Sequence, residues 1–284
     1  MKKIYPPLNL LHLIIISCVT LLIIFGSCSK DTLIPKKSRL KEMNSYDSNN
    51  KLYEKVEYEY SGDKISKETR YSIDSLENKT IYSYTTYEYS SFYLKKKYVS
   101  VQSSSNYQYI QEYFFADKGY AYMCIDNSSS SNFTSTDTTF YFYDSNGYLI
   151  ELNNGTDDKT VYEIVNGNTA NANYYNKIDS AGISNWIFSG KIIYTYDNNI
   201  NPFSSFSISL SEDGLVFGNN NFIGTKNRNF LTKMEYFDNG QTYSTDTYDF
   251  FYELDPLGNI TKMKYTYYYN NQTYSETMEF IYEN

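Results

Sequence analysis

The residue types that most often carry out chemistry in proteins, histidine and cysteine, are scarce in this chain of 284 residues. It has one histidine, His12, and three cysteines, Cys18, Cys28 and Cys124. Thiolates act as nucleophiles and metal ligands, and imidazole acts as a base and as a ligand. What these four residues can do depends on the segments that hold them.

Residues 1–27 have the pattern of a secretory signal peptide. Lys2 and Lys3 form a short basic start, residues 10–25 form an apolar run, and small residues stand directly before Cys28. A basic start, an apolar core and small residues at a cut site are together typical of such signals. Because the run approaches the ~20 apolar residues that span a bilayer, an uncleaved transmembrane anchor is the alternative.

The residues around Cys28 resemble a lipobox, the motif at which bacterial lipoproteins are cleaved and acylated. The match is Phe25-Gly26-Ser27-Cys28, with Phe where Leu is commonest, and Ile15-Ile16-Ser17-Cys18 is a competing match inside the apolar run. The resemblance implies that residues 1–27 are removed and that Cys28 carries acyl chains such as palmitate. Since one acyl chain binds a membrane only marginally, several chains on the cysteine are needed for a stable anchor.

The residues after Cys28 indicate where the anchor would hold the protein. Ser29 follows the cysteine, so the aspartate that retains enteric lipoproteins in the inner membrane is missing. We therefore expect an exported protein whose membrane partner is the outer membrane, reached through the lipid on Cys28, at its periplasmic face or at the cell surface. Residues 28–45 are polar, contain Pro35 and are expected to form a tether, followed by a single domain over 46–284.

Loss of the signal peptide would leave a mature chain without histidine, since His12 is the only one. This excludes Ser-His-Asp and Cys-His catalysis and histidine-ligated zinc, iron and copper. With Cys18 removed and Cys28 acylated, Cys124 has no disulfide partner, and its apolar surroundings (121–125) favour a buried, unreactive thiol. We predict no catalytic residue, no metal site and no cofactor, and hence no enzyme.

Carboxylates are the abundant reactive groups that remain. A pair of them can hydrolyse glycosidic bonds without histidine, and the candidates are Glu57, Glu59, Glu253, Asp255 and Glu276. Alternation and turn signals place nearly all of them on solvent-facing strand positions or in turns, so a carboxylate-based glycosidase is the less favoured alternative. The loops at 144–147 and 197–199 carry only part of the ligand set that calcium needs, so ordinary hairpin turns are favoured there.

The charge of the chain argues against nucleic acid as a partner. Its formal net charge is −8 and its pI is about 4.8, and loss of Lys2 and Lys3 makes the mature chain more acidic. The cluster Lys95-Lys96-Lys97 is too small to provide the basic stripe that nucleic-acid binding needs.

Apolar and polar residues alternate with period two through the body of the chain. Val56, Tyr58 and Tyr60 alternate with Glu57 and Glu59, which is the pattern of a strand with one covered face. The 35 tyrosines suit such strands, because Tyr has a high strand propensity and an amphipathic ring. No convincing helical pattern is longer than two turns.

Short turn signals separate these strands. Asp, Asn and Gly pairs recur at 61–63, 117–119, 144–147, 166–168, 238–240, 255–259 and 270–271. Strands joined by such tight turns are antiparallel neighbours. We therefore predict an all-β fold, a long antiparallel meander of β-hairpins that forms a curved sheet, a half-barrel or a sandwich. An irregular excursion is expected near 197–228, where alternation is poor.

Two segments, 140–150 and 251–263, resemble YD-type repeats, in which a Tyr-rich strand, an Asp and Gly turn and a second strand recur. A third segment, 193–203, contains Tyr-Thr-Tyr-Asp followed by Asn-Pro-Phe and is similar to Bacteroidota lipoproteins with a YD-like β domain of unknown function. The resemblance covers about residues 50–284. It implies the β domain of an exported lipoprotein, and that family has no established catalytic residues to carry over.

These expectations favour a tethered, non-catalytic binding module whose partner is a glycan or a peptide. Trp186 is the candidate for stacking on a ligand ring, although its apolar strand favours a place in the core. A structural or assembly component of an envelope complex is the alternative, because long exposed sheet edges accept strands of a partner protein.

The resemblance also implies O-glycosylation, since exported Bacteroidota proteins are often modified at Asp followed by Ser or Thr and an apolar residue or Thr. Matching tripeptides make candidate acceptors of Thr32, Ser75, Thr138 and Ser180. All four are expected in the tether or in turns, where a transferase could reach them.

Overall fold

The computed structural model describes residues 38–101, 107–116, 119–130, 133–155, 157–180, 183–200, 207–211, 214–218, 223–269 and 272–283. The predicted signal peptide, Cys28 and Thr32 lie outside the described residues. No helix long and apolar enough to cross a membrane occurs in the part of the chain that the structure describes.

The described chain is built from β-strands joined in chain order. The strands are β1 (Leu40–Tyr46), β2 (Leu52–Ser61), β3 (Lys64–Ile73), β4 (Lys79–Tyr89), β5 (Tyr93–Ser100), β6 (Gln108–Phe115), β7 (Ala121–Ser129), β8 (Thr134–Tyr143), β9 (Leu149–Asn153), β10 (Asp158–Val165), β11 (Asn168–Ser180), β12 (Ile183–Ile200), β13 (Ser207–Ser211), β14 (Gly214–Gly218), β15 (Asn229–Asp238), β16 (Asp246–Leu254), β17 (Ile260–Tyr269) and β18 (Gln272–Tyr282). The all-β prediction and the antiparallel pairing of neighbouring strands are confirmed.

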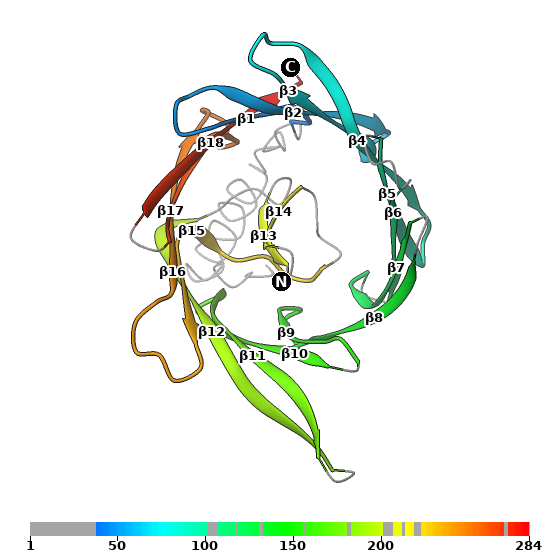
Figure 1. The fold of residues 1–284 in the computed structure, drawn as a ribbon, viewed down its shortest axis with the longest axis vertical. Helices are drawn as coiled ribbons and strands as arrows, with labels where there is room; N and C mark the ends of the chain where they lie inside the picture. Colours follow the sequence, from blue (N-terminus) through cyan, green and yellow to red (C-terminus); the bar gives the residue numbers. More distant parts are fainter. Residues whose placement is uncertain are drawn as a thin grey trace, which may run out of the picture. The chain divides into compact units, whose positions relative to one another are not determined.

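Sixteen of these strands form a closed antiparallel barrel, whereas β13 and β14 form a separate two-stranded sheet. Figure 1 shows the ring viewed along its axis. The prediction of a curved sheet, half-barrel or sandwich was therefore wrong in its final step. The ring closes because β1 pairs with β18, from Leu40 opposite Tyr282 to Tyr46 opposite Thr277, and no local pattern in the sequence shows that these distant segments meet.

The first strand begins before the predicted boundary between tether and domain. Residues 40–45, assigned to the polar tether, form β1 together with Tyr46 and pair with both β18 and β2. The barrel therefore begins at Leu40 rather than near residue 46. In the same way, β12 continues to Ile200 and β13–β14 is a regular hairpin, so the excursion predicted near 197–228 is only partly irregular.

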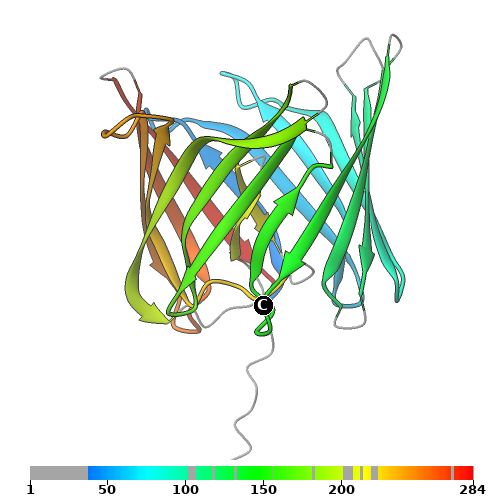
Figure 2. The same ribbon diagram turned by 90° about the horizontal axis from the view of Figure 1, so that it is seen from below.

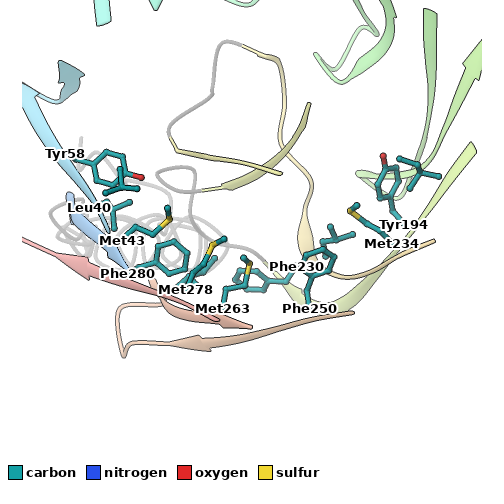
Figure 3. Close-up of a cluster of buried hydrophobic side chains, with 14 of the residues drawn as sticks. Leu40, Met43, Tyr58, Tyr194, Phe230, Met234, Phe250, Met263, Met278 and Phe280 are labelled. Carbon is teal, nitrogen blue, oxygen red and sulfur yellow. The ribbon is translucent and has the colours of Figure 1, made fainter. Parts of the chain in front are cut away.

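Strand alternation gives the barrel wall two faces, and registry between neighbours keeps each face continuous around the ring. Met263 lies opposite Met278, and Met43 lies opposite Phe280 and Val56. These residues belong to the main hydrophobic cluster, and Figure 3 shows its labelled side chains pointing into the interior of the ring. We call this side the inner face, and the side that alternates with it the outer face.

The two ends of the barrel differ. We call the end where β1 begins and β18 ends the proximal end; it also holds the β2–β3, β4–β5, β6–β7, β8–β9, β10–β11 and β16–β17 connections. Figure 2 shows the C-terminus at this end. We call the opposite end, with the β1–β2, β15–β16 and β17–β18 connections among others, the distal end.

Both segments that carried the repeat resemblance form hairpins with the same turn chemistry. The Asp144 carboxylate accepts hydrogen bonds from the backbone N–H groups of Asn146 and Tyr148, each at 2.9 Å. Asp255 accepts one from the N–H of Asn259 at 2.8 Å. The Asp in each segment thus satisfies backbone donors that the turn leaves free.

A strap from Gly224 to Asn229 leads into β15 across the proximal turns. The N–H of Thr225 donates to the Gly147 carbonyl at 2.7 Å, and the N–H of Arg228 donates to the Gly167 carbonyl at 2.9 Å. The strap needs glycine where it touches the β8–β9 turn. Gly224 has a φ of +95°, and a Cβ there would lie 2.6 Å from the Gly147 carbonyl oxygen.

We predict that Gly224→Ala destabilises the barrel more than Gly240→Ala. Both residues have a positive φ, which costs a side chain roughly 1–2 kcal/mol, but Gly240 has nothing within 4 Å of its built Cβ. The additional clash should therefore appear only at Gly224. Urea unfolding followed by circular dichroism measures both variants, and equal free energies of unfolding would contradict a tightly packed strap.

Candidate functional site

A row of tyrosines crosses four neighbouring strands on the inner face near the distal end. It consists of Tyr236, Tyr248, Tyr267 and Tyr274, from β15 to β18. Tyr248 and Tyr267 lie directly opposite each other, as do Tyr267 and Tyr274. The ring centroids are 5.7, 5.6 and 4.8 Å apart along the row, and the last two pairs are stacked. We call this set the tyrosine row.

The tyrosine row lies where the inner face is open to solvent. Tyr274 is 37% exposed, whereas Phe280, further along the same strand and face, is 3% exposed. Inner-face residues near the proximal end, such as Phe250 and Ile260, are also buried. The interior is therefore packed toward the proximal end, and a ligand would reach the inner wall from the distal end.

Carboxylates next to the row are held by tyrosine hydroxyls. Glu276, opposite Tyr265 on the inner face, accepts hydrogen bonds from Tyr265 at 2.5 Å and from Tyr53 at 2.8 Å. Burial and the Glu276 hydrogen bond raise the pKa of Tyr265 above its ordinary value. The phenol stays protonated and can keep donating to the carboxylate.

A second charged group lies on the inner face of β2, β3 and β4. The Arg70 guanidinium is 3.1 Å from the Glu54 carboxylate and 3.9 Å from the Glu68 carboxylate. Tyr82 donates to Glu54, and Tyr87 donates to Glu68. Two inward carboxylates thus share one cation and are each bound by a phenol.

Acidic side chains outnumber basic ones along the inner face of the wall. By strand registry the acidic residues are Glu54, Glu68, Asp126, Asp137, Asp158, Asp238, Asp246 and Glu276, and the basic residues are Arg70 and Lys96. The inner wall therefore offers hydrogen-bond acceptors and a negative potential beside aromatic rings. No group of three acidic, cysteine or histidine residues that could hold a metal occurs among the described residues.

The outer face carries charged side chains of both signs, unlike the mainly acidic inner face. It carries ion pairs between neighbouring strands, such as Lys55 with Glu42 at 2.7 Å and Lys95 with Glu112 at 3.1 Å. The Lys79 ammonium lies 2.6 Å from the Glu57 carboxylate. This contact is the largest cause of the lowered pKa of Glu57, and a hydrogen bond from the Tyr71 hydroxyl lowers it further. Ion pairs thus join several strands of the outer wall among β1–β6 and between β17 and β18.

The stacking candidate Trp186 lies away from the tyrosine row. It belongs to the tip of the β11–β12 hairpin, which projects from the ring in Figure 1. It lies opposite Lys177 on the outer face, and the Lys159 ammonium is 5.1 Å from its ring centroid. The structure therefore places it neither in the core that its apolar strand favoured nor beside the inner wall.

The other residues singled out from the sequence are dispersed. Cys124 is buried on the inner face, and burial raises the pKa of its thiol, as expected for an unreactive cysteine. Glu57 and Glu59 face outward and contact lysines, and Asp255 caps a turn. Only Glu276 of the five carboxylate candidates lies beside the tyrosine row.

The described candidate acceptors for O-glycosylation differ in placement. Ser75 lies in the exposed β3–β4 turn, as predicted. Thr138 lies within β8 and Ser180 is the last residue of β11, so the expectation that both fall in turns was wrong. Both lie in strands because β8 and β11 continue further than the turn signals indicated.

The tyrosine row and the Arg70 group were missed from the sequence. Alternation does place Tyr265, Tyr267 and Tyr269 on one face, which is the signal that points to the row. Which face turns inward depends on closure of the ring, and Arg70 gains its role only because β2 and β4 flank it.

Fold and site together define a closed antiparallel β-barrel with an aromatic, acidic inner wall and a charged outer wall. Among solved structures, a porin-like protein from Bacteroides uniformis ATCC 8492 matches with a TM-score of 0.60, 16% identity and coverage of 86% of this chain and 96% of its own. This similarity shows a porin-like barrel fold. A porin-like protein from Bacteroides vulgatus ATCC 8482 aligns over 87% of this chain and 99% of its own at 14% identity, but its TM-score of 0.26 is too low to bear on the fold. No family model and no curated protein matches the sequence.

We predict that the barrel loses stability between pH 10 and 12. Burial, and then the hydrogen bond to Glu54, raises the pKa of Tyr82 to about 12, and burial raises that of Tyr89 to about 12. A raised pKa in the folded state adds stability below the unfolded value of about 10, and this stability is lost as the pH rises through the folded value. Urea unfolding at several alkaline pH values measures the loss. Tyr82→Phe should show a smaller decline, and a free energy of unfolding independent of pH in this range would contradict the prediction.

Proposed function

We propose that this protein is an exported lipoprotein, held at the outer membrane by acyl chains on Cys28, whose barrel stands in water and binds a glycan at the tyrosine row. The observation that carries the proposal is the division of the wall, with paired charges outside and accessible tyrosines inside near the distal end. Each part of the proposal has its own support.

The charged outer wall supports a barrel that stands outside the bilayer. Barrels that span membranes present an apolar band to lipid, and Lys or Arg at the bilayer midplane costs about 2–4 kcal/mol. Here lysines such as Lys55, Lys95 and Lys262 lie on the outer face in ion pairs with glutamates of neighbouring strands. A separate anchor is then needed to hold the protein at a membrane, and the acylated Cys28 provides it.

The chemistry of the tyrosine row supports a carbohydrate ligand. Aromatic rings pack against the C–H faces of sugars, and carboxylates and phenols bind sugar hydroxyls. Tyr274 presents its ring at the accessible end of the row, and Glu276 lies two residues along the same strand and face. The inner wall thus combines a stacking surface with hydrogen-bond acceptors.

A peptide is the second candidate ligand, and the excess of acidic residues on the inner face favours a cationic one. Salt separates the two ligands, because it screens charge pairing and leaves the binding of a neutral sugar nearly unchanged. Catalysis is not part of the proposal. The inward carboxylates of Glu54 and Glu68 share the single cation Arg70 and each accepts a hydrogen bond from a tyrosine, so both are held in contacts within the wall.

An assembly role in an envelope complex is the alternative function, and it now rests on a different feature of the fold from the one expected. Closure of the ring leaves the barrel without the long open edges on which that role was expected to rest. The β11–β12 hairpin instead projects beyond its neighbours, since β12 pairs with β15 only from Gly190 onward. Its tip offers strand edges to a partner protein.

We predict that Tyr267→Ala combined with Tyr274→Ala weakens glycan binding by about tenfold or more, because each aromatic contact contributes roughly 0.5–1.5 kcal/mol. Tyr268→Ala is the matched control, since Tyr268 lies between the two along the chain but on the outer face. A glycan array identifies the ligand, and calorimetry on the wild type and both variants measures its affinity.

Three results would contradict a glycan site at the row: no glycan bound, equal loss in the Tyr268→Ala control, or full affinity in the double variant. Binding of a cationic peptide instead, weakened by salt, would favour the second ligand.

We predict that the wild-type protein carries acyl chains on Cys28 and that Cys28→Ser carries none, because without a thiol at position 28 there is no atom to acylate. The intact mass of each form, purified from cells that export it, measures the attached lipid. A wild type without acyl mass, or a variant with the same acyl mass as the wild type, would contradict lipid anchoring.

A further inference from the structure

Aromatic and apolar side chains collect on the outer face of β5–β9 at the proximal end. They are Phe92, Tyr93, Phe114, Tyr122, Met123, Phe140, Phe142 and Ile150. We call this set the rim patch. Phe92 in the β4–β5 turn is 76% exposed, and Phe142 is 48% exposed. A contiguous group of exposed aromatic residues on one part of the outer wall marks an interaction surface.

Strand registry shows that the rim patch is one continuous surface. Tyr93 lies opposite Phe114, Phe114 lies opposite Met123, and Met123 lies opposite Phe140. This row crosses four neighbouring strands on a single face. Phe142 lies two residues beyond Phe140 on β8, closer to the proximal end.

The same strands are polar further from the proximal end. On the outer face Lys95 pairs with Glu112, and Asn127 lies opposite Thr136. The exposed aromatic side chains are therefore concentrated at the rim, and further along the same strands charged and hydroxyl side chains lie beside Ile110 and Ile125. A surface with one apolar edge and one polar edge fits a boundary between water and lipid better than the interior of either.

The position of the tether selects the occupant. The described barrel begins with Ser38 and β1 at the proximal end, so the chain from Cys28 joins the barrel there. Fully extended, the chain from Cys28 to Ser38 spans at most about 35 Å. With Cys28 acylated, the proximal end stays close to the bilayer, and exposed Leu257 in the β16–β17 turn and Ile281 near the end of β18 add apolar surface at the same end.

We propose that the rim patch docks into the interfacial layer of the lipid bilayer, so that the barrel stands on its proximal end and its distal tyrosine row faces away from the membrane. The orientation relative to the anchor rests on the acylation of Cys28 put forward above. Aromatic side chains suit this layer because their rings enter the acyl boundary while polar atoms stay hydrated. The bilayer then covers the surface that water would otherwise meet.

The test uses residues 29–284 without lipid, so that docking is measured apart from acylation. This chain contains the whole closed ring, which lies between Leu40 and Tyr282. Co-sedimentation with phosphatidylcholine vesicles compares the wild type with the double variant Phe140→Glu and Phe142→Glu. Ile81→Glu is the matched control, because Ile81 is 43% exposed on the outer face of β4, on the distal side.

We expect the wild type and Ile81→Glu to partition onto vesicles alike, and the double variant to partition at least about tenfold less, since two interfacial phenyl groups are replaced by charges. All three proteins should show the same far-ultraviolet circular dichroism, because the substituted side chains are exposed.

Wild type that stays in solution at every lipid concentration would overturn the proposal, as would equal partition of the double variant and the wild type. Self-association of the wild type through the patch, seen by ultracentrifugation and without vesicle binding, would overturn it in favour of a second copy of the chain. The acyl mass of wild type and Cys28→Ser reports separately on the anchor.

Discussion

The antiparallel pairing of β1 with β18 is the contact on which the rest of the structure depends. It joins the first and last strands of the barrel through a run of partners from Leu40–Tyr282 to Tyr46–Thr277. Closure leaves the ring with no unpaired edge, and it gives the period-two alternation of the strands an inside and an outside. Tyr60, Tyr143 and Tyr282 support the proximal end in a common way. Each hydroxyl donates to the carbonyl of the first residue of the preceding strand, at 2.7–2.8 Å.

With the faces assigned, the high tyrosine content gains a physical explanation. A wide ring needs long side chains to fill its interior, and tyrosine provides an apolar body with a hydroxyl that can hold a buried carboxylate. Tyr87 with Glu68 and Tyr265 with Glu276 show this use. The chain has a porin-like fold, and its wall carries ion pairs on the outer face and a row of aromatic rings on the inner face. A shared fold does not by itself decide function.

The two ends of the barrel divide the proposed tasks. The proximal end combines the strap, the packed interior, the chain start and the rim patch, all of which suit attachment. The distal end presents solvent-accessible rings and carboxylates on the inner wall, which suit recognition. Anchoring through Cys28 and docking through the rim patch would orient the same end toward the membrane, so the two proposals are physically consistent while each has its own test.

The sequence by itself determined the local features of this protein: strands from alternation, hairpins from Asp and Gly turns, and a buried Cys124. These local features depend on residues close together in the chain, where strand propensity and turn chemistry act directly. Only the tertiary structure decided that the meander closes, that residues 40–46 complete the ring, and that Tyr267 faces inward while Tyr268 faces outward. The physical reason is that closure joins segments more than 200 residues apart, and a shift of one residue in register would exchange every inner and outer side chain without changing the local pattern.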